Sequence, residues 1–274
     1  MIAEPEQLAR VERPVIRYFG SKWRLAPWIM SHFKPHDSYI EPFGGSASVL
    51  LQKEPSKLTV YNDLDREVFT FFKVLRDRPQ ELAKLLKNTP YSIEEFRRAY
   101  DPTEDELELA RRFFVRAWQG YGGPRAKRKS GWKRQPRVWD TSRQCQISEW
   151  NKVKQVMGAA RVFRGVHLEN RPAIEVVKSF DNPKALFYLD PPYLEATRNR
   201  RWTDSYTQEM ELWEHAQLLK FLCEVKGQVI ISTYPNDLYE KELQGWGRVA
   251  RSSRTMSHAK QAQEVLYIKP WSAE

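Results

Sequence analysis

The sequence predicts an α/β fold with a mostly parallel sheet, interrupted by a basic and mainly helical insertion. Two observations predict this fold class. Strand-like apolar runs alternate with amphipathic helical segments near both ends of the chain, and the excess positive charge is confined to one stretch between them. Alternating strands and helices are typical of parallel sheets, which bind ligands beyond the carboxyl ends of their strands. We therefore expect functional residues at strand ends and in the insertion.

The length of 274 residues allows one large α/β domain with an insertion. We expect residues 1–78 and 165–274 to form the α/β domain and residues 79–164 to form the insertion. No apolar run approaches the ~18 residues of a membrane span, and the N-terminus lacks the apolar segment of a secretory signal. The two cysteines, Cys145 and Cys223, have neither disulfide nor metal-ligand spacing. We expect a cytoplasmic protein with no membrane partner and no metal.

The first block of the chain, residues 15–78, predicts the order strand, helix, strand, helix. An apolar segment at 38–43 enters a Gly-Gly turn, and a helix is expected directly after it, at 46–53. A second strand is expected at 57–63. The segment 66–77 has apolar residues three and four apart, which is the spacing of a helix that faces a core.

The middle block is predicted to be helical and the last block to return to α/β. In the middle block, helices are expected at 92–101 and 105–118, with acids early and bases late in the second, as the helix dipole favours. In the last block we expect strands at 184–190, 227–234 and 264–270 and an amphipathic helix at 210–227 that ends at a glycine.

The excess of basic over acidic residues lies in one segment of the middle block. Between Arg111 and Arg143 there are eleven basic residues and one acid, whereas the rest of the chain carries 34 bases and 34 acids. The same segment contains Trp118, Tyr121, Trp132 and Trp139. Cations interleaved with flat rings are typical of a surface that binds nucleic acid. The alternatives, a solvated loop or a localisation signal, need no aromatic residues.

The Gly-Gly turn and the acid after the second strand favour a nucleotide-like ligand. Glycines at a strand-to-helix turn let a ligand approach the backbone closely, although such turns are equally common in structural roles. Asp63 follows the turn by about 20 residues and ends the second strand, the position at which α/β nucleotide binders hold ribose hydroxyls. The alternative is that Asp63 caps the helix that follows, a role for which Asp65 is a second candidate.

The sharpest motif is Asp190-Pro191-Pro192-Tyr193, which ends a strand-like run. Proline has no N–H, so the motif offers a carboxylate and carbonyl oxygens that only accept hydrogen bonds. The amino nitrogen of a nucleobase is a poor nucleophile, and bonds from its hydrogens to Asp190 and to the Pro191 carbonyl would free its lone pair. Tyr193 would stack on the same base, a contact worth ~1–3 kcal/mol. The alternative is a strand stopped by two prolines with Tyr193 in the core.

With these motifs in place, the chain resembles the Dam-like DNA adenine-N6 methyltransferases, especially their phage and prophage branch. Six segments carry the resemblance in the family's order, from Val15 to Pro270: "IRYFGSKWRLAPWI", "YIEPFGGSASVLL", "VYNDLD", "YLDPPY", "ISTYPNDLYEKELQGW" and "EVLYIKP". The resemblance implies a Rossmann-like class I methyltransferase sheet and S-adenosylmethionine (AdoMet) as cofactor. It also implies transfer of a methyl group to N6 of an adenine flipped out of double-stranded DNA, with no metal and no covalent intermediate.

The resemblance also implies roles for individual residues. Asp190, Pro191, Pro192 and Tyr193 would hold the target adenine. The cofactor would be bound by Tyr18, Lys22, Glu41, Pro42, Phe43, Gly44, Gly45, Asp63, Asn170 and Asp190, with Glu41 to Gly45 around its methionine end and Asp63 at its ribose.

The basic segment is expected to read the target site, with cations at phosphates and a few polar side chains at bases. The expected DNA-binding residues are Arg116, Arg125, Lys127, Arg128, Lys129, Lys133, Arg134 and Arg137, together with Arg198, Arg200 and Arg201 just beyond the Asp-Pro-Pro-Tyr motif. A nonspecific clamp is the alternative, and it would allow methylation of adenines in many contexts.

Two other functions fit the same motifs. One is a methyltransferase that acts on RNA or on the N4 amine of cytosine, and the identity of the product distinguishes it. The other is a catalytically silent DNA-binding protein on the same fold, against which the intact Asp190 motif, Lys22 and Asp63 argue. The expected setting is the cytoplasm of a bacterium or of a phage-infected host, whereas a restriction partner cannot be derived from the sequence.

The chain departs from the family at Pro172, where relatives tend to have an acid that helps to hold the cofactor's adenine. Tyr18 in place of Trp and Ser21 in place of Gly are milder departures. Glu169 or Asn170 would have to replace the missing acid. We therefore expect Pro172→Asp to bind AdoMet more tightly than the wild type in calorimetric titrations. An unchanged affinity would contradict the role inferred for this position.

Overall fold

The computed structural model describes residues 11–121, 129–134, 147, 150, 154–194, 197, 208–254 and 261–271. The chain forms two compact units. The helical unit comprises Met1–Ala26, Gly45–Lys53 and Asp65–Val166, and the sheet unit comprises Pro27–Gly44, Glu54–Leu64 and His167–Glu274.

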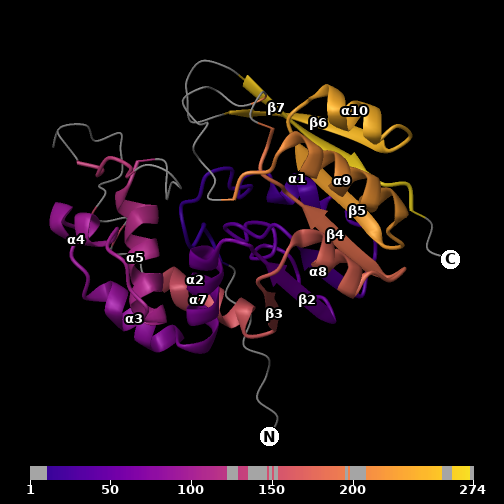
Figure 1. Ribbon diagram of the computed structural model, residues 1–274. Helices are drawn as coiled ribbons and strands as arrows, with labels where there is room; N and C mark the ends of the chain where they lie inside the picture. The colour runs from indigo at the N-terminus through magenta and orange to yellow at the C-terminus, as the bar shows by residue number, and fades with distance from the viewer. Residues whose placement is uncertain are drawn as a thin grey trace, which may run out of the picture. The chain divides into compact units, whose positions relative to one another are not determined.

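A seven-stranded sheet with the order β3-β2-β1-β4-β5-β7-β6 forms the framework of the sheet unit (Figure 1). The strands are β1 (Ser38–Glu41), β2 (Leu58–Asn62), β3 (Val166–Glu169), β4 (Ala185–Leu189), β5 (Gln228–Thr233), β6 (Gly247–Arg254) and β7 (Gln261–Ile268). Strand β1 is parallel to β2 and β4, and β4 is parallel to β5, whereas β7 is antiparallel to β5 and β6. This is a doubly wound, Rossmann-like sheet whose order reverses between β1 and β4. The α/β fold class predicted from the sequence is confirmed.

One face of the sheet packs against the helices α8 (Ala173–Phe180), α9 (Leu212–Glu224) and α10 (Asp237–Glu242). Every residue of β4 and of β5 is buried, as expected for the central strands of a sheet that is covered on both faces. The shared core contains Ile40, Val60, Val176, Phe187, Leu189, Leu218, Leu222, Val229, Ile231 and Tyr239.

Tyrosine side chains point to the other face of the central strands. Helix α1 (Ala26–Met30) precedes Phe33, whose ring centroid lies 5.7 Å from that of Tyr39 and 6.4 Å from that of Tyr188. Because side chains alternate along a strand, the tyrosines of β1 and β4 lie on the face opposite Ile40 and Phe187. The hydroxyl of Tyr39 bonds to Glu41, and the hydroxyl of Tyr188 bonds to Ser232.

In the part of the helical unit that the structure describes, the helices are α2 (Arg66–Asp77), α3 (Pro79–Lys87), α4 (Ile93–Arg98), α5 (Glu106–Gln119) and α7 (Lys154–Phe163). Side chains cap three of them at the N-terminus. Asp65 accepts from the Glu67 N–H of α2, Ser92 from the Glu95 N–H of α4, and Asp105 from the first turn of α5. Asp65, and not Asp63, is therefore the cap of α2.

An aromatic cluster joins α2 to α5 and α7. The rings of Phe72 and Phe163 stack with centroids 4.5 Å apart, and Phe71 stacks on Phe114 at 6.1 Å and contacts Phe113 at 5.7 Å. These contacts explain why α2 belongs to the helical unit. The unit boundary therefore lies at Asp65 and differs from the boundary expected at residues 78/79.

The prediction of a helix at 46–53 is wrong, because the structure has only turns there. Ala47 has a φ of 52°, which a helix does not allow. The hydroxyls of Ser46 and Ser48 lie 2.8 Å apart, and Ser48 also contacts the hydroxyl of Ser21 at 2.7 Å. Serine side chains that bond locally compete with the regular hydrogen bonds of a helix.

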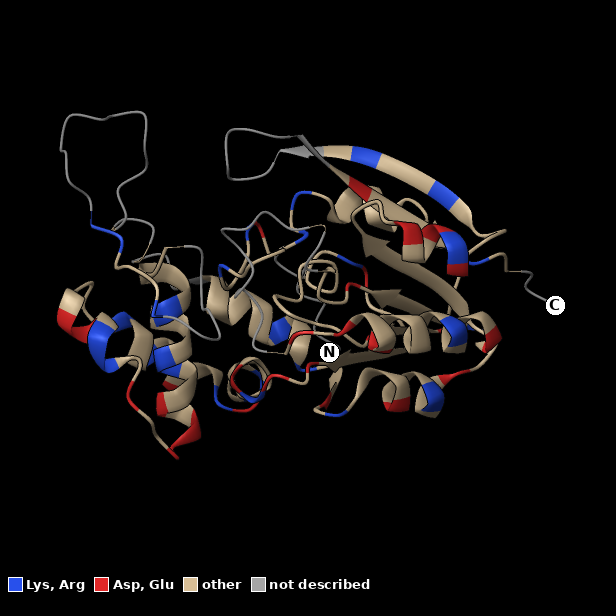
Figure 2. Cartoon of the chain, turned by 45° about the horizontal axis from the view of Figure 1, so that its top comes forward, with Lys and Arg blue, Asp and Glu red and all other residues tan. Residues whose placement is uncertain are grey.

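Basic and acidic residues are interspersed along the helices of the helical unit (Figure 2). Arg111 is buried and pairs with Glu95 at 2.6 Å and with Glu108 at 2.7 Å. Its guanidinium therefore joins α5 to α4. Within the described part of the chain, no helix is long and apolar enough to cross a bilayer.

Candidate active site and nucleic-acid surface

Parallel pairing gathers the predicted acids of the sheet unit at one edge of the sheet. Glu41 ends β1, Asp63 follows β2 and Asp190 follows β4. In the register of these strands, Glu41 pairs with Tyr61, and Ile40 pairs with Phe187. Since β1 lies between β2 and β4, its carboxyl end is the centre of this group. This is the edge at which doubly wound sheets bind ligands.

The carboxylate of Asp190 is positioned by the neighbouring strand. The Ser232 hydroxyl of β5 donates to Asp190 Oδ1 at 2.9 Å, and the Tyr188 hydroxyl lies 3.1 Å from the same serine oxygen. Burial, assisted by the charge of Asp190, raises the pKa of Tyr188 well above its ordinary value. The phenol therefore keeps its proton and can donate to Ser232, so that the chain of hydrogen bonds ends on the carboxylate.

Tyr193 is also held from a distant strand. Its side chain is buried, and its hydroxyl donates a short hydrogen bond to the buried carboxylate of Glu264 on β7. Its ring meets Tyr234 at an edge, with centroids 4.6 Å apart. Burial and the charges of Asp190 and Glu264 raise the pKa of Tyr193 well above its ordinary value, which keeps the donor protonated.

Glu41 is a buried carboxylate with one tyrosine partner on its own strand. Only 2% of the residue is exposed, and the Tyr39 hydroxyl donates to Oε1 at 2.5 Å. Burial, followed by the charge of Glu41, raises the pKa of Tyr39 well above its ordinary value. The pair places negative charge at the end of β1, where Pro42, Phe43 and Gly44 begin the turn.

Gly44 is required because the turn passes directly over a ring. A Cβ on Gly44 would lie 2.1 Å from the Tyr61 ring, closer than any real side-chain contact. The Gly44 N–H donates to the carbonyl of Asn62 at 2.8 Å. Nothing larger than glycine fits at this position, so the turn has no side chain at Gly44.

Asn62 connects the loops that follow three adjacent strands. Its buried amide donates to the Pro42 carbonyl at 2.7 Å and to the Arg171 carbonyl at 3.0 Å, and its oxygen accepts from the Arg171 N–H at 2.9 Å. One side chain at the end of β2 thus fixes the loops after β1 and β3. Asn62 was not predicted from the sequence, although an amide directly before Asp63 was a visible signal.

Asn170 has a supporting role beside Asp63. Its amide donates to the Asp63 carbonyl at 2.6 Å, and the Asp63 N–H donates to the Glu169 carbonyl at 3.4 Å. Pro172 is the N-cap residue of α8, and its carbonyl accepts from the N–H groups of Glu175 and Val176. The Glu169 carboxylate is paired with Arg171 at 2.8 Å.

In the helical unit, Tyr18 lies against Gly45, and Lys22 is held near its own segment of the chain. A Cβ on Gly45, which has a φ of 48°, would lie 3.4 Å from the Tyr18 ring. Lys22 is buried, and its Nζ donates to the Gly20 carbonyl at 2.8 Å. Ser21, which departs from the family pattern, contacts Ser48 and so links the N-terminal motif to the turn after Gly45.

Seven of the expected DNA-binding cations lie outside the described residues: Arg125, Lys127, Arg128, Arg137, Arg198, Arg200 and Arg201. Lys129 and Arg134 are exposed, as a contact with phosphate requires. The described part of the chain contains no cluster of three or more His, Cys, Asp or Glu that could hold a metal ion.

Arg116 was expected to contact DNA, and the structure corrects this prediction. Only 6% of the residue is exposed. Its guanidinium pairs with Glu67 at 2.6 Å and donates a short hydrogen bond to the Ala99 carbonyl. A buried, paired arginine cannot reach a phosphate, so Arg116 joins α5 to α2 instead. Position in a basic stretch of sequence does not reveal which way a helical side chain faces.

Lys133 is half-buried, and its Nζ donates to the Trp118 carbonyl at 3.2 Å. Burial, followed by the nearby charge of Arg17, lowers the pKa of Lys133 to about 7. At neutral pH this side chain is therefore a weaker candidate for a phosphate contact than Lys129 or Arg134.

Glu264 and Ser232 were also not predicted from the sequence, because each forms a hydrogen bond with a residue far away in the chain. Glu264 and Tyr193 are 71 residues apart, and Ser232 and Asp190 are 42 residues apart. The available signals were a hydroxyl group and a carboxyl group next to the apolar residues of β5 and β7.

The Tyr193–Glu264 hydrogen bond should be measurable in a double-mutant cycle of Tyr193→Phe and Glu264→Gln. Because the acceptor is a buried carboxylate, we expect a coupling free energy of about 1.5–3 kcal/mol in denaturant unfolding. A cycle that pairs Tyr193→Phe with Glu175→Gln on α8 is the control. Coupling no larger than in the control would contradict the contact.

Lys133 should make stability depend on pH. Below pH 7 its ammonium is charged in both states, so the cost of burying it is fully present. Between about 7 and its unfolded pKa near 10.5, only the unfolded state keeps the proton, and stability rises with pH. Lys133→Met should therefore stabilise the chain more at pH 6 than at pH 9 in urea titrations. Lys133→Arg, which stays charged throughout, is the control, and an equal gain at both pH values would refute this assignment.

Comparison with known proteins identifies relatives of the chain. It is 25% identical over 218 residues to the type II methyltransferase M1.LlaDCHI of Lactococcus lactis subsp. cremoris, covering 72% of this chain and 71% of that one.

Two solved structures match at low similarity. A conserved hypothetical protein from Streptococcus pyogenes has a TM-score of 0.40 and 10% identity, covering 91% of this chain and 95% of that one. An AdoMet-dependent methyltransferase from Agrobacterium tumefaciens has a TM-score of 0.38 and 10% identity, covering 94% of this chain and 64% of that one. Neither structure is similar enough to bear on function. The family model that describes D12 class N6 adenine-specific DNA methyltransferases matches residues 18–256, and the chain therefore belongs to this family.

Proposed function

We propose that this chain is a site-specific DNA methyltransferase in which Asp190, Pro191, Pro192 and Tyr193 hold the target adenine. Its family transfers a methyl group from AdoMet to the N6 amine of adenine in DNA. One observation carries the assignment of residues. The Asp190 carboxylate is held by Ser232 at the carboxyl end of β4 and is followed directly by two prolines.

The chemistry of the amine explains why this arrangement suits the reaction. The N6 lone pair is delocalised into the purine ring, so the nitrogen must be made more nucleophilic. An oriented carboxylate and a carbonyl without a competing N–H accept its two hydrogens and favour a tetrahedral nitrogen. Ser232 holds the carboxylate through Oδ1, which limits the reorganisation needed when substrate arrives. Asp190 therefore acts as a positioned acceptor.

Tyr193 is proposed to form a wall of the adenine pocket. Its hydroxyl is held by Glu264 and its ring lies against Tyr234, so its orientation is set before a base enters. A ring fixed at both ends loses little conformational freedom when it stacks on a base.

The ends of β1 and β2 in the sheet unit fit the cofactor. AdoMet is cationic at its sulfonium and carries ribose hydroxyls that donate hydrogen bonds, and the unit presents the carboxylates of Glu41 and Asp63. At Gly44 the turn has no side chain, and its backbone packs against the Tyr61 ring. We propose that Glu41 to Gly44 bind the methionine end and Asp63 the ribose. When bound, AdoMet supplies the electrophilic methyl group.

The substrate is proposed to be double-stranded DNA from which the adenine is flipped, because its N6 is enclosed by base pairing and stacking in a duplex. The helical unit is proposed to recognise the target site through Lys129, Arg134 and the cations outside the described residues. The name of the Lactococcus relative supports a role in restriction–modification, and we propose a bacterial cytoplasm as the setting.

The decisive test replaces Asp190 with Asn. The variant keeps the shape of the side chain but removes its charge, and we expect kcat to fall by about 10²–10³-fold. Labelled AdoMet and unmethylated duplex DNA report the rate, and digestion with chromatography identifies N6-methyladenine as the product.

Asp237→Asn, the same change at an exposed residue of α10, is the matched control and should retain activity. Full activity in Asp190→Asn would refute the role of the carboxylate. Sequencing of methylated adenines in DNA from expressing cells would distinguish a specific target site from methylation in many contexts.

A further inference from the structure

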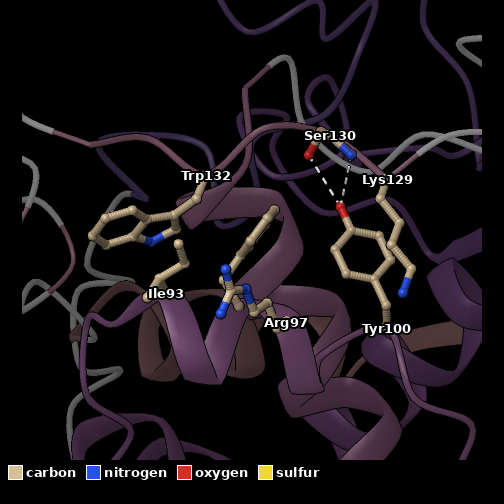
Figure 3. Close-up of a pocket in the computed structure, with 7 residues that line it drawn as sticks. Ile93, Arg97, Tyr100, Lys129, Ser130 and Trp132 are labelled. Atoms are coloured by element: carbon tan, nitrogen blue, oxygen red, sulfur yellow. Dashed lines mark hydrogen bonds between the residues drawn. The ribbon is translucent and has the colours of Figure 1, made fainter.

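We propose that a hollow on the helical unit, lined by Arg97 and Lys129, binds a nucleotide unit of the substrate DNA. The inference rests on the proposed function and adds a contact residue, Arg97, that lies outside the basic segment identified from the sequence. The hollow has a volume of about 230 Å³ (Figure 3). Its lining residues are Ile93, Phe96, Arg97, Tyr100, Lys129, Ser130 and Trp132.

The wall of the hollow is already in place in the free chain. The segment 129–134 is tied to the rest of the unit by hydrogen bonds from the Ser130 N–H to the Tyr100 hydroxyl, 3.0 Å, and from Trp132 Nε1 to Gln119 Oε1, 3.2 Å. The Lys133 N–H donates to the Gln119 carbonyl at 2.8 Å. A surface that is fixed in advance loses less entropy when it binds.

The charges around the hollow favour an anion. Its lining includes two cations and no acid. The acids of α4 are already neutralised by other arginines, since Glu94 pairs with Arg98 at 3.2 Å and Glu95 with Arg111 at 2.6 Å. Arg97 is exposed and forms no ion pair with any residue that the structure describes. Its charge is therefore available to a ligand.

The rings around the hollow favour an anion that carries a flat, partly apolar group. Tyr100 and Trp132 stand on either side of Arg97 in Figure 3, with the Lys129 ammonium 5.4 Å from the centroid of the Tyr100 ring. The Trp132 N–H is already bonded to Gln119, and its ring contacts Tyr91 at 5.5 Å. A nucleotide combines a phosphate for the two cations with a base or sugar for the rings. An acidic peptide would match only the cations.

The inference is tested with Arg97→Gln, Lys129→Gln and the double variant. Binding of a short duplex is followed by fluorescence anisotropy over a range of salt concentrations. We expect each single variant to bind several-fold more weakly. The slope of log K against log[salt] should fall by about 0.9 for each phosphate contact that is lost. Trp132→Leu should weaken binding with little change in slope, because a ring carries no charge.

Arg98→Gln is the matched control, because it makes the same change on the adjacent residue, whose guanidinium is engaged by Glu94. An equal loss of DNA affinity in Arg97→Gln and Arg98→Gln would overturn the inference. It would also be overturned if a poly-glutamate peptide displaced the bound duplex as effectively as unlabelled DNA does. AdoMet binding to each variant shows that it is folded. Methylation by the wild-type chain tests the proposed function separately, so a failure of the hollow would leave that function standing.

Discussion

Parallel pairing of β1 with both β2 and β4 determines where the functional side chains of the sheet unit lie. The order of the sheet reverses between β1 and β4, and doubly wound sheets bind ligands at the carboxyl ends of the strands at such a reversal. The proposed cofactor residues follow β1 and β2, and the proposed adenine residues follow β4. Asn62 then fixes the loops after β1 and β3 with three hydrogen bonds from one buried amide. If this register shifted by one residue, Glu41 would point to the opposite face.

Several buried hydrogen bonds between polar side chains lie at the edge of the sheet. Tyr39 bonds to Glu41, Ser232 to Asp190 and Tyr193 to Glu264. Each pair satisfies a buried group that would otherwise cost stability, and each orients an acceptor or a ring. The same hydrogen bonds therefore serve both folding and chemistry. This dual use explains why strands β5 and β7, which carry no recognised catalytic motif, contribute directly to the site.

The helical unit divides its cations between two tasks. Arg111 and Arg116 are enclosed and paired with acids, so their charges hold helices together. Arg97, Lys129 and Arg134 are exposed, and their charges remain available for DNA. Arg111 and Arg116 lie on α5 and pair with acids of α4 and α2, whereas Lys129 and Arg134 lie outside the described helices. Counting the charges of a segment overestimates its capacity to bind phosphate when part of that charge is used internally.

The sequence by itself determined the α/β class, the strands that carry Glu41 or lead into Asp63 and Asp190, and the helices α2, α4, α5 and α9. Periodicity and strand-ending motifs are local, so they survive without knowledge of the fold. Only the tertiary structure decided that α2 packs in the helical unit, that residues 46–53 form turns and that Arg116 is buried. It also revealed Glu264 as the partner of Tyr193. These outcomes depend on contacts between residues far apart in the chain, and no spacing within one segment encodes them.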